Sequence, residues 1–290
     1  MRRFDYASPT SVAEASQALV SRPDARPLAG GTDLLIQMKE RGRIVPLVVS
    51  LRRVGALHEL SANGSLAIGA MVTCGEVAEH DAVRRYWPIL SDGAELVGSI
   101  QIRNRGTVGG NVCNAAPSAD VSPALVALAA TAHIGGSAGT RSIDIEQFFR
   151  GPGQTALTRG EVLTRIDVPR PAAGSGGAYL RHVPRREMDI AVVAVGVQLR
   201  LANDGRTVAD ARVVLGAVAP VPLRSRGAEV ALIGSTLDAA ALTRAGEAAA
   251  ADARPISDVR ATADYRRELL KVYTRRVAQI ALGRARANAG

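Results

Sequence analysis

The sequence predicts an α+β protein built in two parts. In the first part short apolar strands alternate with segments of helical periodicity, whereas the second part begins with two alternating strands and closes with three helical patterns. Between them lies the glycine- and proline-rich stretch RPAAGSGG, residues 170–177, which has the composition of a linker. We therefore expect two domains, residues 1–175 and 176–290.

Two capping patterns mark helix starts in the first part. Ser11 and Glu14 form a capping-box pattern that opens an amphipathic helix, and Thr73 and Glu76 form a second. The other elements expected there are helices at 34–40, 83–97 and 124–130, strands at 26–29, 47–51, 132–134 and 162–168, and a hairpin of 57–60 with 66–70 across the turn at 63–64.

The second part has a different pattern. The alternating segments 191–201 and 211–219, joined by a turn at 203–205, predict an antiparallel sheet. Helices are expected at 224–233, 239–253 and 262–286, the last with apolar residues at helical spacing on one face.

Composition limits the possible partners. The formal charge is +9 and the pI near 10.4, but the arginines are spread along the chain and aromatic residues make up only 3%. A protein that binds single-stranded nucleic acid stacks bases on aromatic side chains, so we expect no nucleic-acid partner, and an acidic partner protein explains the charge as well.

No apolar run approaches the roughly 20 residues of a membrane helix. No apolar segment follows the N-terminal arginines, so we expect no signal peptide and a cytoplasmic protein.

The chain has only two cysteines, Cys74 and Cys113. They are too few for a disulfide framework or for an iron-sulfur cluster on four thiolates. Cys113 could be a small packing residue or a nucleophile, and the first interpretation is favoured. The histidines are dispersed, so we expect no metal site and no catalytic side chain in this chain.

Two segments with paired glycines are the strongest candidates for a binding site. They are AGGTD, residues 29–33, and TVGGN, residues 107–111. Glycine lets the backbone approach a ligand closely and direct N–H groups toward an anion such as phosphate. For each segment alone, a tight turn that requires positive φ is the favoured interpretation. Two of them in one domain favour a pyrophosphate held from two sides.

Two further polar features allow two interpretations each. Asp120 could be the N-cap of a helix that begins near Ser122, or its carboxylate could accept a hydrogen bond from a ring N–H of a ligand. The segment RHVPRREMD, residues 181–189, could be a solvated turn or could neutralise an anionic ligand. Because no acid–base pair is evident, a bound cofactor would supply the chemistry.

In this order, these segments resemble the FAD-binding medium subunit of the molybdenum hydroxylases, the family of xanthine dehydrogenase and carbon monoxide dehydrogenase. The resemblance covers nearly the whole chain and rests on FDYASPTSVAEA, LAGGTDLLIQMK, IGAMVT, IRNRGTVGGNVCNAAPSADVSPALVAL, FFRGPGQTAL, GEVLTRIDVP and RREMDIAVVAVGVQL. It implies a two-part FAD-binding domain of the vanillyl-alcohol-oxidase (PCMH) type, with subdomains of about 1–55 and 56–175. A C-terminal domain of antiparallel sheet and helices would follow, as in carbon monoxide dehydrogenase flavoproteins.

The resemblance also implies roles for particular residues. The residues that would wrap the FAD diphosphate are Ala29, Gly30, Gly31, Thr32 and Asp33, with Leu34, Leu35 and Ile36 behind them, and Thr107, Gly109, Gly110 and Asn111 from the second subdomain. Asn114 and Asp120 would lie toward the flavin ring, and Leu163 would contact the ring through its backbone. Arg181 stands where relatives have lysine and would stabilise negative charge on the reduced flavin. Val97 stands where some relatives have an aromatic residue.

The implied function is that of an electron-transfer subunit. A large molybdopterin-binding subunit would supply electrons to 2Fe-2S clusters on a small partner subunit. FAD would take the electrons from these clusters and pass them to a quinone, NAD or oxygen. The complex would be a cytoplasmic heterohexamer, and this chain would not turn over the organic substrate alone. Two other functions stay open: a self-sufficient FAD-dependent oxidase or dehydrogenase, and a non-catalytic nucleotide-binding or scaffold protein.

Overall fold

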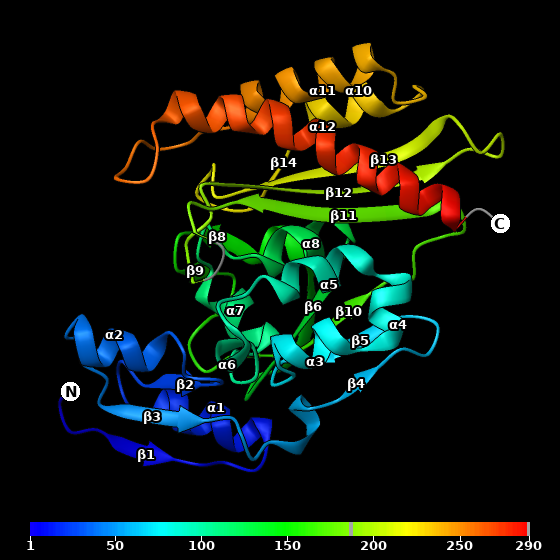
Figure 1. Cartoon of the computed structure of the whole chain (residues 1–290). Helices are drawn as coiled ribbons and strands as arrows, with labels where there is room; N and C mark the ends of the chain where they lie inside the picture. The colour runs from blue at the N-terminus through cyan, green and yellow to red at the C-terminus, as the bar shows by residue number, and fades with distance from the viewer. Residues whose placement is uncertain (186–187, 289–290) are drawn as a thin grey trace.

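A computed structural model describes residues 1–185 and 188–288 of the chain. The polypeptide forms three stacked units that follow one another along the sequence (Figure 1). A small N-terminal unit contacts one side of a middle unit, and a C-terminal unit with long helices covers the opposite side.

The N-terminal unit is a three-stranded parallel sheet with two helices. Its strands β1 (Asp5–Ala7), β2 (Arg26–Leu28) and β3 (Leu47–Ser50) have the order β1-β3-β2, and its helices are α1 (Val12–Ser21) and α2 (Leu34–Glu40). The central strand β3 is buried along its length, as its run of apolar residues requires. Ser11 caps α1 as expected, but the Glu14 carboxylate accepts a hydrogen bond from the N–H of Thr10 at 2.8 Å, so the predicted capping box is shifted by one residue.

The middle unit is built on a five-stranded sheet in the order β4-β5-β10-β6-β7. Its strands are β4 (Leu60–Ser61), β5 (Leu66–Gly69), β6 (Thr131–Gly136), β7 (Gly139–Asp144) and β10 (Val162–Val168), with a small hairpin of β8 (Phe149–Gly151) and β9 (Gln154–Thr155). Its helices are α3 (Cys74–Glu79), α4 (Asp81–Tyr86), α5 (Pro88–Glu95), α6 (Ile100–Arg103), α7 (Val108–Asn114), α8 (Val121–Ala127) and α9 (Ile145–Phe148). Thr73 and Glu76 form a complete capping box for α3, which confirms that prediction.

Two elements of the middle unit differ from expectation. The predicted helix 83–97 is divided into α4 and α5 at Trp87, because the following Pro88 disfavours helical backbone in the residue before it. The predicted strand 57–60 is only two residues long, since the preceding residues form the 3₁₀ turn η1 (Gly55–Leu57). The hairpin of β4 with β5 is nevertheless present.

The C-terminal unit is a four-stranded antiparallel sheet covered by three helices on one face. The elements are β11 (Ser175–His182), β12 (Val193–Leu201), β13 (Val208–Gly216), β14 (Leu223–Arg224), α10 (Arg226–Leu232), α11 (Ala239–Asp252) and α12 (Ala263–Ala287). The last residues of the predicted linker belong to β11, which passes directly under α12. A Cβ atom at Gly176 would lie 2.2 Å from the carbonyl oxygen of Ala281, so only glycine fits at this crossing.

The other face of this sheet packs on the middle unit. The main core of the middle unit includes Tyr179, Ala194 and Val214 from three strands of the C-terminal sheet. The sheet is therefore buried on both faces, which explains its nearly continuous apolar strands. This packing fixes β11 against the middle unit.

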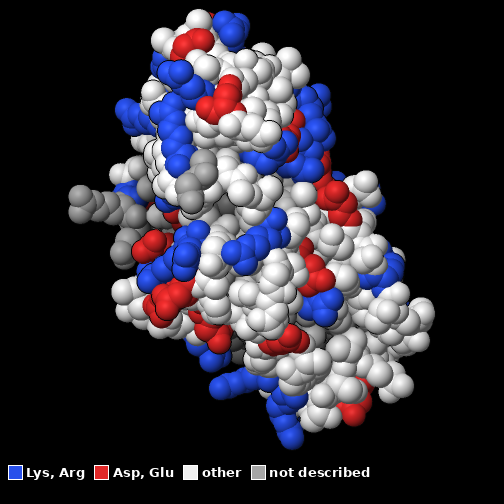
Figure 2. All heavy atoms as spheres, turned by 90° about the vertical axis from the view of Figure 1, so that its right-hand side faces the viewer, with Lys and Arg blue, Asp and Glu red and all other residues white. Residues whose placement is uncertain are grey.

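On the face shown in Figure 2, basic and acidic side chains are interspersed. Within residues 1–185 and 188–288, no helix is both long and apolar enough to cross a membrane.

Candidate functional site

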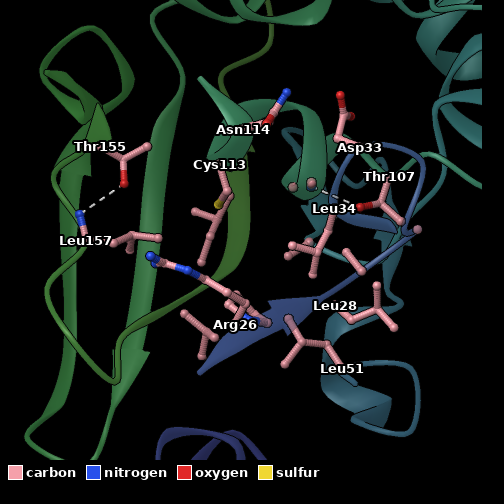
Figure 3. Close-up of a pocket in the computed structure, with 18 of the residues that line it drawn as sticks. Arg26, Leu28, Asp33, Leu34, Leu51, Thr107, Cys113, Asn114, Thr155 and Leu157 are labelled. Carbon is pink, nitrogen blue, oxygen red and sulfur yellow. Dashed lines mark hydrogen bonds between the residues drawn. The ribbon is translucent and has the colours of Figure 1, made fainter. Parts of the chain in front are cut away.

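A cavity of about 870 Å³ lies between the N-terminal and middle units (Figure 3). Its walls come from three parts of the chain: residues around β2 and the start of α2, the residues of α7, and the loop between β9 and β10. Sites for cofactors usually have volumes of roughly 300–1,000 Å³, so the cavity is large enough for one.

The two glycine segments lie against each other in the wall of this cavity. A Cβ atom at Gly30 would be 1.9 Å from the carbonyl oxygen of Arg105, and one at Gly109 would be 2.5 Å from that of Ala70. Glycine is needed at both positions because a Cβ atom would overlap a carbonyl oxygen of the opposing backbone. Of the paired glycines only Gly31 has positive φ, at 81°, so the tight-turn interpretation holds for Gly31 alone.

The second glycine segment is helical and is not a loop. Gly109 and Gly110 form the first turn of α7, and the Thr107 hydroxyl accepts a hydrogen bond from the N–H of Gly110 at 2.9 Å. The segment is fixed to the turn after β5, since Cys74 donates its N–H to the carbonyl of Gly106 at 2.9 Å.

Polar side chains with free hydrogen-bonding capacity face the cavity. The Oδ1 atom of Asn111 is buried and has no hydrogen-bond partner among the described residues. Asp33 occupies the N-cap position of α2 without a capping hydrogen bond from its side chain. The residue is exposed, but partial desolvation of its carboxyl raises its pKa, which the charge of Arg41 and a hydrogen bond with Asn114 oppose. An unpaired buried polar atom is costly, so a polar ligand that donated a hydrogen bond to Asn111 would stabilise this wall.

The structure brings together most of the residues predicted to bind the cofactor. The predicted residues in the cavity wall are Ala29, Gly30, Gly31, Thr32, Asp33, Leu34, Thr107, Gly109, Gly110, Asn111, Asn114 and Leu163, and Val97 is there as well. Four predicted residues are not in this wall: Leu35, Ile36, Asp120 and Arg181. Ile36 is exposed on α2.

Asp120 and Arg181 form a buried ion pair between the middle and C-terminal units. The guanidinium of Arg181 donates a hydrogen bond of 2.6 Å to Asp120, and the Tyr179 hydroxyl donates one of 2.8 Å to the other carboxylate oxygen. Burial raises the pKa of Asp120 to about 6, although Arg181 and Tyr179 favour the charged form. Asp120 does precede α8, but its side chain makes no capping hydrogen bond.

Cys113 and the segment 181–189 also have defined places. Cys113 faces the cavity, and burial raises the pKa of its thiol to about 12, which favours packing over a nucleophilic role. His182 is half-buried and its Nδ1 lies 3.2 Å from the hydroxyl of Tyr273. Arg186 and Glu187 lie outside the described residues.

Sequence reasoning missed the charged part of the wall. Arginines at positions 22, 26, 43 and 159 line the cavity, together with the carboxylates of Asp24 and Glu161. These residues are far apart in the sequence and follow no motif, so only the folded chain shows that they share a site.

Comparison with known families identifies the class of protein. The model of the FAD-binding domain in molybdopterin dehydrogenase matches residues 2–171, and that of the CO dehydrogenase flavoprotein C-terminal domain matches residues 178–281.

Individual relatives match the chain over nearly its whole length. The chain is 36% identical over 285 residues to the carbon monoxide dehydrogenase medium chain of Afipia carboxidovorans, covering 98% of each. It is 32% identical over 288 residues to the xanthine dehydrogenase FAD-binding subunit of Escherichia coli O157:H7, covering 97% of this chain and 98% of the relative.

Solved structures show the same fold. A chain of carbon monoxide dehydrogenase from Hydrogenophaga pseudoflava superposes with a TM-score of 0.93 at 33% identity, and one of quinoline 2-oxidoreductase from Pseudomonas putida 86 with 0.91 at 34%; each comparison covers 98% of both chains. The chain therefore belongs to the family of FAD-binding medium subunits of the molybdenum hydroxylases. It is an oxidoreductase subunit and its cofactor is FAD.

Proposed function

We propose that the cavity between the N-terminal and middle units is the FAD site, with the diphosphate between the two glycine segments. The observation that carries this proposal is the close approach of Gly30 to Arg105 in the cavity wall, beside the unpaired oxygen of Asn111. The wall combines exposed backbone, hydroxyls and amides, and a dinucleotide offers phosphate oxygens and sugar hydroxyls as their partners.

The residues divide into three proposed roles. Residues 29–34 hold the diphosphate from one side, and Thr107, Gly109, Gly110 and Asn111 hold it from the other. Asn114 and Leu163 are proposed to contact the ring, and both line the cavity. Leu35 and Ile36 support this wall from α2.

For Asp120 and Arg181 we propose a supporting position behind the wall. Their side chains are paired with each other and lie outside the cavity lining, so the pair holds the chain between α7 and α8 in place. Direct contact of Asp120 with the ring, and of Arg181 with its negative charge, stays a prediction.

We propose that the chain works in a complex with a small 2Fe-2S subunit and a large molybdopterin-binding subunit, as a heterohexamer in the cytoplasm. Bound FAD would accept electrons from the 2Fe-2S partner and pass them to a quinone, NAD or oxygen. Two observations support the need for partners: the chain has only two cysteines, and the described residues contain no group of three or more His, Cys, Asp or Glu side chains that could hold a metal.

The division at residue 175 is also a proposal. It is supported by the two family models, which end at 171 and begin again at 178. The separate core of the C-terminal sheet and its three helices supports it as well.

The test is the absorption spectrum and the partner content of the purified protein. We expect a flavin spectrum, co-purification with a small chain that carries 2Fe-2S clusters and a large chain that carries molybdopterin, and no oxidation of organic substrate by this chain alone. The Gly110→Val variant should lose FAD, because the added side chain would meet the Thr107 hydroxyl, 2.9 Å from the Cβ position, and fill the cradle. Substrate turnover by the isolated chain would favour the self-sufficient oxidase, and absence of flavin would favour the scaffold protein.

A further inference from the structure

The second glycine segment is attached to the turn between β5 and α3, residues 70–74. Thr73 of the turn and Thr107 of the segment form an isolated antiparallel bridge. Two backbone hydrogen bonds of 2.9 Å flank this bridge, from Cys74 to Gly106 and from Val108 to Val72. The turn therefore sets the position at which the second glycine segment enters α7.

The same part of the chain lies against the first glycine segment. A Cβ atom at Gly30 would be 1.9 Å from the carbonyl oxygen of Arg105, and one at Gly106 would be 3.6 Å from the hydroxyl of Thr32. Residues 105–107 are thus layered between the first glycine segment and the turn. A displacement of the turn would change the spacing of the two glycine segments.

The turn is held by backbone hydrogen bonds except at Thr73. The N–H groups of the other four residues of the turn, Ala70, Met71, Val72 and Cys74, donate to backbone carbonyls. The N–H of Thr73 donates instead to the carboxylate of Glu76 at 2.7 Å, and the Thr73 hydroxyl donates to the same oxygen at 2.7 Å. Glu76 is exposed and is not among the residues that line the cavity. A side chain outside the cavity thus holds the residue that bridges to the cavity wall.

We propose that Glu76 is a positioning residue for FAD binding, which acts through Thr73 on the second glycine segment. Its carboxylate keeps Thr73 in the extended backbone of a helix N-cap, with φ −77° and ψ 155°. The bridge partner Thr107 is then placed so that its hydroxyl accepts the N–H of Gly110. A wall that is ordered before the ligand arrives binds it more tightly than one that is ordered only part of the time. This inference rests on the proposed location of FAD.

The other capping glutamate of the chain provides a matched control. Glu14 is also exposed, and its carboxylate accepts hydrogen bonds from the N–H and the hydroxyl of Thr10 at 2.8 and 3.1 Å. Its own N–H donates to the Ser11 hydroxyl at 3.1 Å, as that of Glu76 does to the Thr73 hydroxyl at 3.1 Å. These bonds of Glu14 involve neither glycine segment.

The experiment uses the full chain with the variants Glu76→Ala, Glu76→Gln and Glu14→Ala. Amide hydrogen exchange of residues 106–112 is measured by mass spectrometry on the FAD-free protein, and FAD is then titrated into the same samples. Glutamine retains an oxygen that can accept both hydrogen bonds from Thr73, so Glu76→Gln tests for rescue by a conservative substitution.

We expect Glu76→Ala to accelerate the exchange of residues 106–112 and to weaken FAD binding, each by about 3- to 30-fold, the range expected for loss of a capping interaction. Glu76→Gln should stay within about twofold of the wild type in both measurements. Glu14→Ala loses an equivalent cap and should also stay within about twofold, because its helix start is not joined to the cavity wall.

Unchanged exchange in Glu76→Ala, or faster exchange with unchanged FAD affinity, would overturn the inference. An equal loss of FAD affinity in Glu14→Ala would also overturn it, because the effect would then follow from general destabilisation. A cofactor bound elsewhere on the chain gives a different result, since Gly110→Val would then keep its FAD as well.

Discussion

Arg284 of α12 binds the carboxylate of Asp92 in α5 through both ends of its guanidinium, with Nη1–Oδ2 and Nη2–Oδ1 distances of 2.6 and 3.0 Å. Asp92 also accepts a hydrogen bond from the N–H of Tyr179 at 3.1 Å, and Arg284 donates to the carbonyl of Gly177 at 2.7 Å. One ion pair thus joins the last helix, β11 and the middle unit.

The Arg284→Ala variant should be destabilised by about 1–3 kcal/mol, because it leaves a partly buried carboxylate without its bidentate partner. Urea unfolding measures the change. Arg267→Ala is the control, since among the described residues Arg267 pairs with the exposed Asp264 of its own helix, and its loss should cost less than about 0.5 kcal/mol. Equal effects of the two substitutions would show that the Asp92 contact contributes nothing to stability.

The buried carboxylate of Asp120 predicts a pH dependence of stability. Its pKa in the folded protein is raised to about 6 from an ordinary value of 3.8, so the folded state binds a proton that the unfolded state has already released. The stabilising contribution of this protonation is complete below pH 4 and is lost as the pH rises through 6. Urea unfolding between pH 4 and 7 should show this slope in the wild type and a flatter one in Asp120→Asn. The same slope in both proteins would rule out Asp120 as its source.

The contact between the glycine segments predicts that Gly30→Ala damages both stability and cofactor binding. The new Cβ would overlap the carbonyl oxygen of Arg105 at 1.9 Å, and backbone cannot move aside without separating the two walls of the cavity. We expect a loss of about 1–3 kcal/mol in unfolding free energy and reduced FAD content. Gly55→Ala is the control, because nothing lies within 4 Å of its Cβ position and its φ is not positive. A flavin-replete Gly30→Ala protein would contradict the assigned site.

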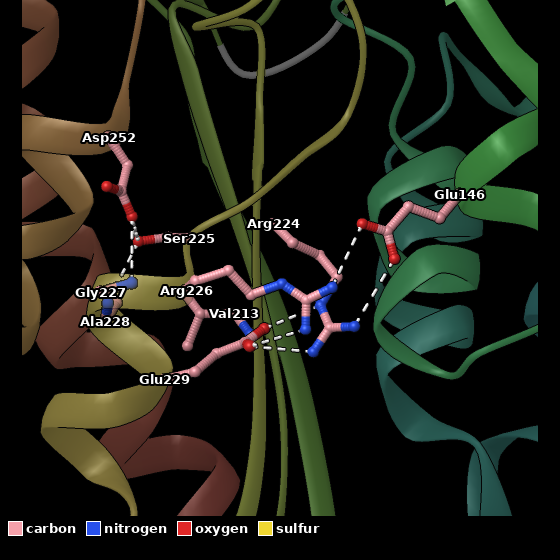
Figure 4. A network of polar contacts seen from close by, with 9 residues as sticks. All are labelled: Glu146, Val213, Arg224, Ser225, Arg226, Gly227, Ala228, Glu229 and Asp252. Carbon is pink, nitrogen blue, oxygen red and sulfur yellow. Dashed lines mark hydrogen bonds and ion pairs between the residues drawn. The ribbon is translucent and has the colours of Figure 1, made fainter.

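A second ionic network joins the middle and C-terminal units around Glu229 (Figure 4). Glu229 is buried and accepts hydrogen bonds from Arg224 at 2.8 and 2.9 Å and from the N–H of Val213 at 3.1 Å. Glu146 of α9 reaches the same cluster only at 3.5 Å from Arg224 and 3.6 Å from Arg226.

The two glutamates of this network should therefore differ in their effect on stability. Glu229→Gln should cost about 3 kcal/mol, since Arg224 would lose the charge that compensates its burial. Glu146→Gln should cost less than about 1 kcal/mol, because that pair is longer and partly solvated. Thermal and urea unfolding of both variants give the comparison, and a larger effect at Glu146 would contradict this account.

The sequence determined the regular elements and the residue types of the proposed binding site. Helical and alternating periodicities predicted β10 at Val162–Val168 and α2 at Leu34–Glu40, because these patterns follow from which side chains must face a core. The paired glycines and neighbouring amides predicted the cavity wall for a comparable reason, because a close approach of two backbone segments requires glycine at the contact. The break at Trp87 was also present in the sequence, in the proline that follows it.

Only the tertiary structure decided which distant residues meet. Asp120 pairs with Arg181 and Asp92 with Arg284, although no local pattern links the members of each pair. Contacts of this kind depend on how β11 and α12 pack on the middle unit. Such packing comes from many weak apolar contacts distributed over the chain, and the charged side chains are placed by it.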